Sequence, residues 1–342
     1  MTNKEVKPFM SDMLNHYCCG REALDALPEH STMNAIILNH YDAYRLGTQG
    51  PDFFYYHHPM PWKGARPLHR YGNLIHKKRV DAFFYYGFKY AFTNERDRDI
   101  ILSYLAGFSC HHSLDVATHP YIFYKTGHCE STIPGSRIYS YYHKYFEVLL
   151  DVAHYQYEYQ KLGCFFPLEK LFTPSPRTLN ALEQFFTFIM KYIYGENTPR
   201  NCIKDTVEDT AQLARLFSDP NNRKKHFLQP IERLIQEDRL VTRVFYPLYT
   251  NEYLVLNVAE EPWQHPCTGE IFTDSYPQLF KQAVSDTVRK INMMDNFLDN
   301  DKVTVSEVHE MYENKCYDRA IPCGSDLEMT HFDIIFEKHP QL

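Results

Sequence analysis

Two histidines and an aspartate are spaced so that a helix would stack them on one face. His111, Asp115 and His119 lie at positions i, i+4 and i+8, and a helix with about 3.6 residues per turn points all three the same way. The apolar residues at 100–108 predict that this helix is buried, where imidazoles and a carboxylate need a compensating partner. A divalent metal such as zinc meets that need, because neutral His and ionised Asp are good zinc ligands. The alternative is a pair of hydrogen-bonded core histidines beside one aspartate.

A second stretch, residues 137–161, repeats the pattern. It places His143, Glu147, Asp151 and His154 at i, i+4, i+8 and i+11, which again share one helical face. A polar stripe that faces solvent is the alternative interpretation. Because only a short connection separates the two stripes, we favour a metal site that both helices share.

Three residues earlier in the chain are further candidate ligands, each with a structural alternative. His16 lies on an expected helix, where it could be a structural side chain. Asp52 follows Gly50-Pro51, which breaks a helix, and is either a helix N-cap or a ligand. His76 lies near the start of another expected helix. One catalytic zinc needs about three protein ligands, so the combined set suffices for two or three metals if one carboxylate bridges. The full candidate set is His16, Asp52, His76, His111, Asp115, His119, His143 and Glu147.

The composition is that of a globular protein with an acidic balance. Of 342 residues, 44% are hydrophobic and 23% are charged, which is usual for such proteins. The net charge of −7 disfavours a long nucleic acid as partner. No apolar run follows the first lysines, and no window approaches the ~18 apolar residues of a membrane span. We therefore expect a cytoplasmic protein without a signal peptide or transmembrane segment, whose nine cysteines are reduced.

Almost every long segment has helical periodicity, which predicts an all-α fold. Besides the central helix, helices are expected at 10–29, 31–46, 73–93, 137–161, 178–194, 205–217, 228–243 and 275–299. Pro120 predicts that the central helix ends at His119. One short extended piece is expected at 253–258, and a loop at 263–270.

The ordered motifs resemble those of the zinc-dependent phospholipase C family, an all-α group that includes the bacterial phosphatidylcholine-type phospholipases C. The resemblance is carried by LGTQGPDF at 46–53, GNLIH at 72–76, LAGFSCHHSLD at 105–115, HPY at 119–121, and the segment from His143 to Glu147. The chain is more distantly similar to the fungal single-strand nucleases. The similarity spans about residues 10–160. It implies a multi-helix bundle of this type at residues 1–200, with an α-rich extension at 201–342 packed on it.

The resemblance also implies a role for each candidate ligand. Asp52, His76, His111 and Asp115 would hold one zinc ion. His119, His143 and Glu147 would hold a second. His16 and Asp115 would contribute to a third, with Asp115 as the bridge. Asp52 would also be the general base, or the group that orients the attacking water.

The sequence departs from the family pattern at two points. Secreted members bind the third ion through an amino-terminal Trp, whereas this chain starts with Met1-Thr2. The gap from Asp115 to His119 is also shorter than in the best-known secreted enzymes, although it suits a straight helix. We therefore expect two or three zinc ions.

The implied activity is hydrolysis of a phosphodiester bond, of the phospholipase C type. Clustered zinc ions lower the pKa of bound water toward ~7 and bind the phosphate oxygens. The expected partner is a phosphodiester substrate, with a phospholipid as one candidate. Two alternatives keep the metal site: a nuclease or nucleotide phosphoesterase, and a non-catalytic protein that zinc braces. The sequence leaves the true substrate and the oligomeric state open.

Overall fold

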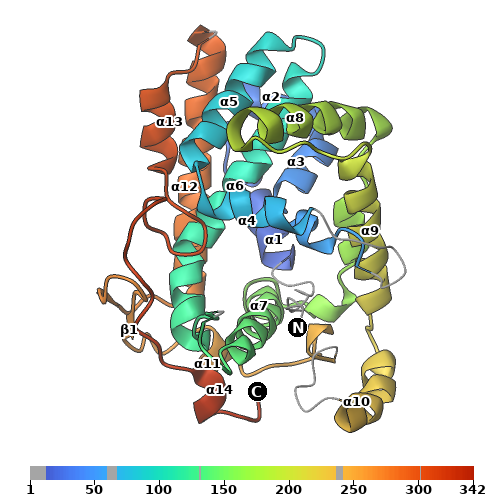
Figure 1. Ribbon diagram of the computed structural model, residues 1–342, viewed down its shortest axis with the longest axis vertical. Coiled ribbons are helices and arrows are strands. Elements are labelled where there is room, and N and C mark those ends of the chain that lie inside the picture. The colour runs from blue at the N-terminus through green and yellow to red at the C-terminus, as the bar shows by residue number, and fades with distance from the viewer. Residues whose placement is uncertain (1–12, 60–67, 131, 236–241, 301) are drawn as a thin grey trace.

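The computed structural model describes residues 13–59, 68–130, 132–235, 242–300 and 302–342. In this part of the chain the regular secondary structure is almost entirely helical, which confirms the all-α prediction (Figure 1). The α-helices are α1 (Met13–Asp25), α2 (Thr32–Asn39), α3 (Tyr41–Gly47), α4 (His69–Lys77), α5 (Val80–Thr93), α6 (Arg98–Thr126), α7 (Arg137–Tyr159), α8 (Pro176–Tyr194), α9 (Cys202–Phe217), α10 (Arg223–Ile235), α11 (Glu252–Val255), α12 (Tyr276–Asn300), α13 (Val305–Tyr312) and α14 (Ile335–Lys338). Short 3-10 turns are η1 (Asp52–Tyr56), η3 (Gly163–Phe165), η4 (Leu168–Phe172) and η5 (Thr242–Val244).

The central element is α6, which other helices surround (Figure 1). Helix α3 packs closely against it, and two glycines make this approach sterically feasible. A Cβ atom at Gly107 would lie 2.1 Å from the backbone oxygen of Tyr44, and one at Gly47 would lie 2.3 Å from that of Tyr104. Larger residues would push the two helices apart. The close contact brings the turn after α3, and with it Asp52, next to α6.

Two of the expected helices are each divided. The segment 31–46 forms α2 and α3, because His40 leaves the helical conformation with φ −126° and ψ 41°. The segment 73–93 forms the end of α4 and all of α5, which are separated at Arg79, a residue in the left-handed region with φ 57°. Sequence periodicity continues across both breaks, so it gives no sign of them.

The prediction that Pro120 ends the central helix was wrong. Helix α6 continues to Thr126 with Pro120 inside it. A proline inside a helix removes one hydrogen bond and costs about 3 kcal/mol. The turn that follows compensates for this cost, because Tyr121 and Ile122 are fully buried and the Tyr121 hydroxyl donates to the Val255 backbone oxygen over 3.0 Å.

The extended piece predicted at 253–258 was also wrong. The first part of this segment lies in α11, whose start is capped by the side-chain oxygen of Asn251. Two short strands occur instead within and just after the loop expected at 263–270. They are β1 (Trp263–Gln264) and β2 (Ile271–Phe272), which pair antiparallel with Trp263 opposite Phe272.

The later helices share one hydrophobic core with the earlier ones. Helix α12 runs along α6 (Figure 1). There the ammonium of Lys290, which is buried, contacts three acceptors: Asp286 Oδ2 at 2.7 Å, Ser113 Oγ at 2.9 Å and His112 Nδ1 at 3.1 Å. A domain boundary at residue 200 stays a prediction.

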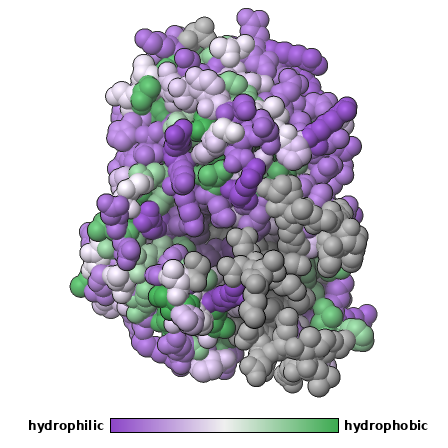
Figure 2. All heavy atoms as spheres, in the orientation of Figure 1, coloured by the Kyte–Doolittle hydropathy of each residue, from purple (hydrophilic) through white to green (hydrophobic). Residues whose placement is uncertain are grey.

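The outer surface is mostly hydrophilic on the face shown in Figure 2, where apolar residues are scattered. Among the described residues, no helix is both long enough and apolar enough to cross a membrane.

Candidate metal centre

The structure brings the eight candidate ligands together in three groups, two of which share His111. Within each group, one potential ligand atom per residue lies within 4.8 Å of the others. The groups are His16, His111 and Asp115; Asp52, His76 and His111; and His119, His143 and Glu147. No predicted site residue lies elsewhere.

Asp115 on α6 is the link between the groups. Its Oδ1 atom lies 3.3 Å from Nε2 of His16 and 3.8 Å from Nε2 of His119. Its Oδ2 atom lies 3.1 Å from Nε2 of His111 and 3.8 Å from Nε2 of His76. Asp115 therefore lies at the centre of the candidate ligands, and the helical spacing predicted from the sequence accounts for its contacts with His111 and His119.

The turn after α3 and the end of α4 supply the next pair. Oδ1 of Asp52 lies 3.1 Å from Nε2 of His76. The other ring nitrogen of His76, Nδ1, lies 2.8 Å from the backbone oxygen of Gly72. A carbonyl oxygen can only accept, so Nδ1 carries a proton, and in the neutral ring the lone pair is on Nε2, which faces Asp52. This is the tautomer in which a histidine binds a metal through Nε2.

Helix α7 supplies the third group. Oε1 of Glu147 lies 2.9 Å from Nε2 of His143 and 3.5 Å from Nε2 of His119. The other carboxylate oxygen, Oε2, lies 2.9 Å from the ammonium of Lys144. Lys144 therefore holds one oxygen of Glu147 while the other faces the histidines.

The second half of the α7 stripe has a different role. Asp151 accepts hydrogen bonds from the backbone N–H groups of Leu14 at 3.1 Å and Asn15 at 2.8 Å. These N–H groups belong to the first turn of α1, where a helix leaves donors unsatisfied. The carboxylate thus fixes the start of the helix that carries His16. His154 donates from Nδ1 to the Asn15 side-chain oxygen over 3.0 Å and supports the same helix.

The geometry and burial of these groups fit zinc. Tetrahedral coordination with bonds of about 2.0–2.1 Å separates neighbouring ligand atoms by about 3.3 Å, which is close to the distances between these nitrogens and oxygens. His111 is fully buried, and its Nδ1 atom has no hydrogen-bond partner among the described residues, while its Nε2 atom faces only the carboxylate of Asp115 at 3.1 Å. Such a group is costly to bury unless something else binds it.

The electrostatics of the cluster favour a cation. Burial opposes ionisation of Asp115, but the neighbouring His111 and His119 outweigh it and hold the pKa of Asp115 well below its usual range. Burial lowers the pKa of His16, which keeps its imidazole neutral. At His119, burial is outweighed by Asp115 and Glu147, whose carboxylates raise its pKa to about 10. The carboxylates therefore stabilise positive charge among the histidines.

The comparison with known families agrees with this geometry. The family model for zinc-dependent phospholipase C matches residues 15–197, which is more than half of the chain. The chain belongs to this family. No curated protein and no solved structure matches the chain significantly.

In this zinc-dependent phospholipase C family member, sequence reasoning missed a main-chain contact to the cluster. Tyr317 lies beyond the matched residues, and its backbone oxygen is 3.0 Å from Nδ1 of His119. No residue-type signal could have revealed it, because the contact uses a main-chain atom that every residue has.

A fourth group, also unpredicted, joins η1 to α9. His57, His58 and Asp209 have potential ligand atoms within 4.8 Å. The two imidazoles are stacked 3.8 Å apart at an angle of 19°, so their in-plane lone pairs are poorly placed to converge on one ion. The backbone N–H of His58 donates to Asp209 over 2.8 Å, and Nδ1 of His57 lies 3.1 Å from the Thr206 hydroxyl. These contacts fit a structural connection.

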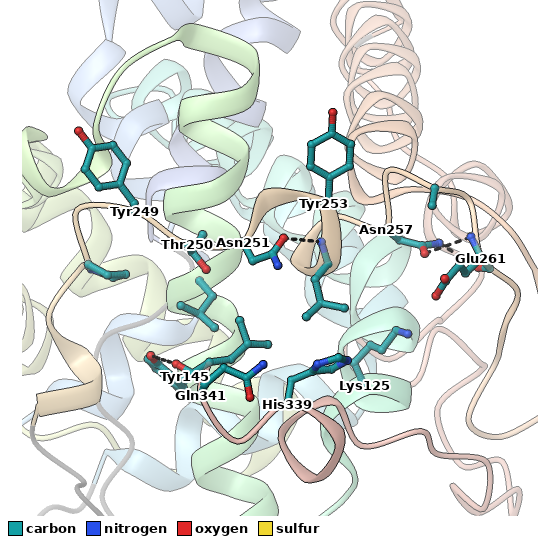
Figure 3. Close-up of a pocket in the computed structure, with 15 residues that line it drawn as sticks. Lys125, Tyr145, Tyr249, Thr250, Asn251, Tyr253, Asn257, Glu261, His339 and Gln341 are labelled. Carbon is teal, nitrogen blue, oxygen red and sulfur yellow. Dashed lines mark hydrogen bonds between the residues drawn. The ribbon is translucent and has the colours of Figure 1, made fainter.

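The structure also contains a pocket of about 530 Å³ between α7, α11 and the last residues of the chain. None of the eight candidate ligands lines it. Lys125 and His339 lie on one side of it, and Tyr249 and Tyr253 lie on another with exposed rings (Figure 3).

Proposed function

We propose that this protein is a zinc-dependent phosphodiesterase of the phospholipase C type. The main support is the convergence of eight histidine and carboxylate side chains from α1, η1, α4, α6 and α7 in a chain of this family. In this proposal Asp52, His76, His111 and Asp115 hold one zinc ion, and His119, His143 and Glu147 hold a second. His16 and Asp115 contribute to a third. The amino-terminal residues Met1 and Thr2, on which the number of ions depends, lie outside the described residues.

The bound ions would supply a nucleophilic water at neutral pH and charge stabilisation for the phosphate. Asp52 is the carboxylate best placed to act on that water. Its side chain is 22% exposed, compared with 2% for Asp115 and 3% for Glu147. A group that contacts substrate needs such access, so Asp52 orients the water or accepts its proton, while the two buried carboxylates remain ligands.

Lys144 complements an anionic substrate. Its ammonium is 29% exposed and contacts Glu147. Although burial opposes its charge, the carboxylates of Glu147 and Asp52 raise the pKa of Lys144, so it is positively charged at neutral pH. A cation beside the cluster attracts a phosphodiester anion. Phosphodiesters are accordingly the proposed substrate class, with phospholipids as one member.

The test is to measure metal content and hydrolysis on the same preparation. Zinc per chain is determined together with activity on bis-p-nitrophenyl phosphate, phosphatidylcholine vesicles and single-stranded DNA. The His111→Ala variant should lose zinc and activity, because His111 belongs to two of the groups. A matched control is His309→Ala, which changes a histidine that is 64% exposed on α13. A wild-type chain without metal, or full activity in His111→Ala, would contradict the proposal. Cleavage of DNA alone would favour the nuclease alternative.

A further inference from the structure

A hairpin beyond the family match lies against the metal centre. Residues 315–322 form this turn, which we call the 315–322 hairpin. Its two sides are joined by a hydrogen bond from the Cys316 N–H to the Ile321 backbone oxygen over 2.9 Å and by a bridge between Lys315 and Pro322. Family similarity ends at residue 197, so this part of the molecule is outside the region to which the family assigns zinc chemistry.

Tyr317 at the tip of the hairpin contacts two of the ligand groups through its main chain. Its carbonyl oxygen accepts from Nδ1 of His119 at 3.0 Å. Its N–H donates to the backbone oxygen of His76 over 3.1 Å. One residue is thus bonded to a member of the Asp52 group and to a member of the Glu147 group.

The hydrogen bond to His119 determines which of its ring nitrogens faces the other candidate ligands. Because the carbonyl can only accept, Nδ1 of His119 carries a proton. Nε2 is therefore the nitrogen that faces Glu147 and Asp115, and it is the atom that would bind a metal once its own proton is displaced. A hydrogen bond from the ring nitrogen that does not bind the metal orients a metal-binding histidine. The loss of such a bond typically weakens metal binding 10- to 100-fold.

The Tyr317 ring reinforces the same arrangement. It is fully buried and lies edge-on to His76 with ring centres 5.0 Å apart, and its centre is 5.8 Å from that of His111. Its hydroxyl has no hydrogen-bond partner among the described residues. The ring therefore acts by packing, and the main chain supplies the polar contacts.

Two further bonds fix the hairpin on the helices that carry the ligands. Asp318 Oδ2 lies 3.2 Å from the ammonium of Lys77, next to His76 on α4. The Lys315 backbone oxygen lies 3.0 Å from Nε2 of His112, next to His111 on α6. The hairpin is thus tied to both helices at positions adjacent to candidate ligands.

We propose that the 315–322 hairpin supports the metal centre from outside the ligand set and holds His76 and His119 in the orientation that binds zinc. This inference rests on the zinc ligands of the proposed function. It assigns Tyr317 as a positioning residue and makes a segment outside the family match necessary for tight zinc retention.

The experiment compares how fast zinc-loaded, full-length variants release zinc to a chromogenic chelator. Tyr317→Ala should release zinc at least tenfold faster than wild type, because the packing that seats the main chain against both histidines is lost. Tyr317→Phe keeps the ring and should match wild type. Tyr104→Ala removes another fully buried tyrosine whose hydroxyl also lacks a described partner. Its ring contacts are phenylalanines, so it should lose stability without faster zinc release.

A second variant covers the case in which Tyr317→Ala does not fold. Lys77→Met removes the ion pair to Asp318 from a side chain that is 53% exposed, and it should also speed zinc release. Wild-type release rates in both variants, measured below their unfolding temperatures, would overturn the proposal. If the wild-type chain holds zinc but hydrolyses no phosphodiester, the proposed function fails while the role of the hairpin stands. A wild-type chain that binds no zinc overturns both.

Discussion

Replacing Gly50 with alanine should displace a central ligand without changing any ligand residue. Gly50 lies in the turn after α3 with φ +51°, and a Cβ atom there would be 2.1 Å from Cδ2 and 2.6 Å from Nε2 of His111. An ordinary carbon–carbon contact is about 3.5 Å. The imidazole would therefore have to move by about 1.4 Å, the difference between these two separations.

This shift is large compared with the tolerance of a zinc site. Zinc–nitrogen bonds are about 2.0–2.1 Å long and vary by about 0.2 Å, so His111 would leave both of its groups. A misplacement of about 1 Å can reduce catalysis about 100-fold. Gly50→Ala should therefore contain less zinc and show at least a ~100-fold lower kcat on bis-p-nitrophenyl phosphate.

Gly195→Ala is the matched control. Gly195 also has a positive φ, +72°, but nothing lies within 4 Å of a Cβ atom there. Both variants carry the cost of left-handed alanine, about 1 kcal/mol, which thermal unfolding can measure. Only Gly50→Ala should lose zinc and activity. Wild-type zinc content and kcat in Gly50→Ala would show that His111 does not bind the metal as argued.

Three further predictions concern metal, pH and charge. A chelator should abolish phosphodiesterase activity and lower the unfolding temperature, and added zinc, but not magnesium, should restore both. An unchanged unfolding temperature would mean that the buried candidate ligands need no bound ion. Burial lowers the pKa of His154 to about 3, against about 6.5 in the unfolded chain. The unfolded chain therefore binds the extra proton, and stability that is present above about pH 6.5 is lost toward pH 3 by up to about 1.4 kcal/mol per pH unit. His154→Gln should flatten this slope in urea unfolding, and an unaltered slope would reject the assignment. Lys144→Gln should raise KM for bis-p-nitrophenyl phosphate about tenfold, equivalent to ~1.4 kcal/mol, whereas the exposed Lys161→Gln should not; equal effects would indicate only a general charge effect.

Local spacing explains why part of the site could be predicted. His111, Asp115 and His119 lie on one helix, so the helical repeat alone fixes their common direction. The same holds for His143 and Glu147. The sequence could not show that Asp151, farther along the same stripe, binds the start of α1 instead, because its partners lie more than 130 residues away.

The features that sequence reasoning missed depend on contacts between distant segments. Helix α6 continues past Pro120 because the burial of the following turn outweighs the tendency of a proline to end a helix. His40 and Arg79 interrupt helices without any break in apolar periodicity. The 315–322 hairpin contacts the cluster through main-chain atoms. Every residue has these atoms, so residue types do not indicate such a contact.

The metal centre draws its surroundings from widely separated parts of the chain, and this determines when it can form during synthesis. His16 is carried by a helix whose Asn15 side chain donates to the hydroxyl of Tyr276 over 3.0 Å, and His76 and His119 are bonded to Tyr317. A nascent chain that has emerged only as far as Glu147 has all eight side chains but lacks these later partners. If the centre binds zinc as proposed, we expect stable capture of the metal only after the distal helices have been translated. A ribosome-bound intermediate would then carry the ligand side chains before it could retain an ion.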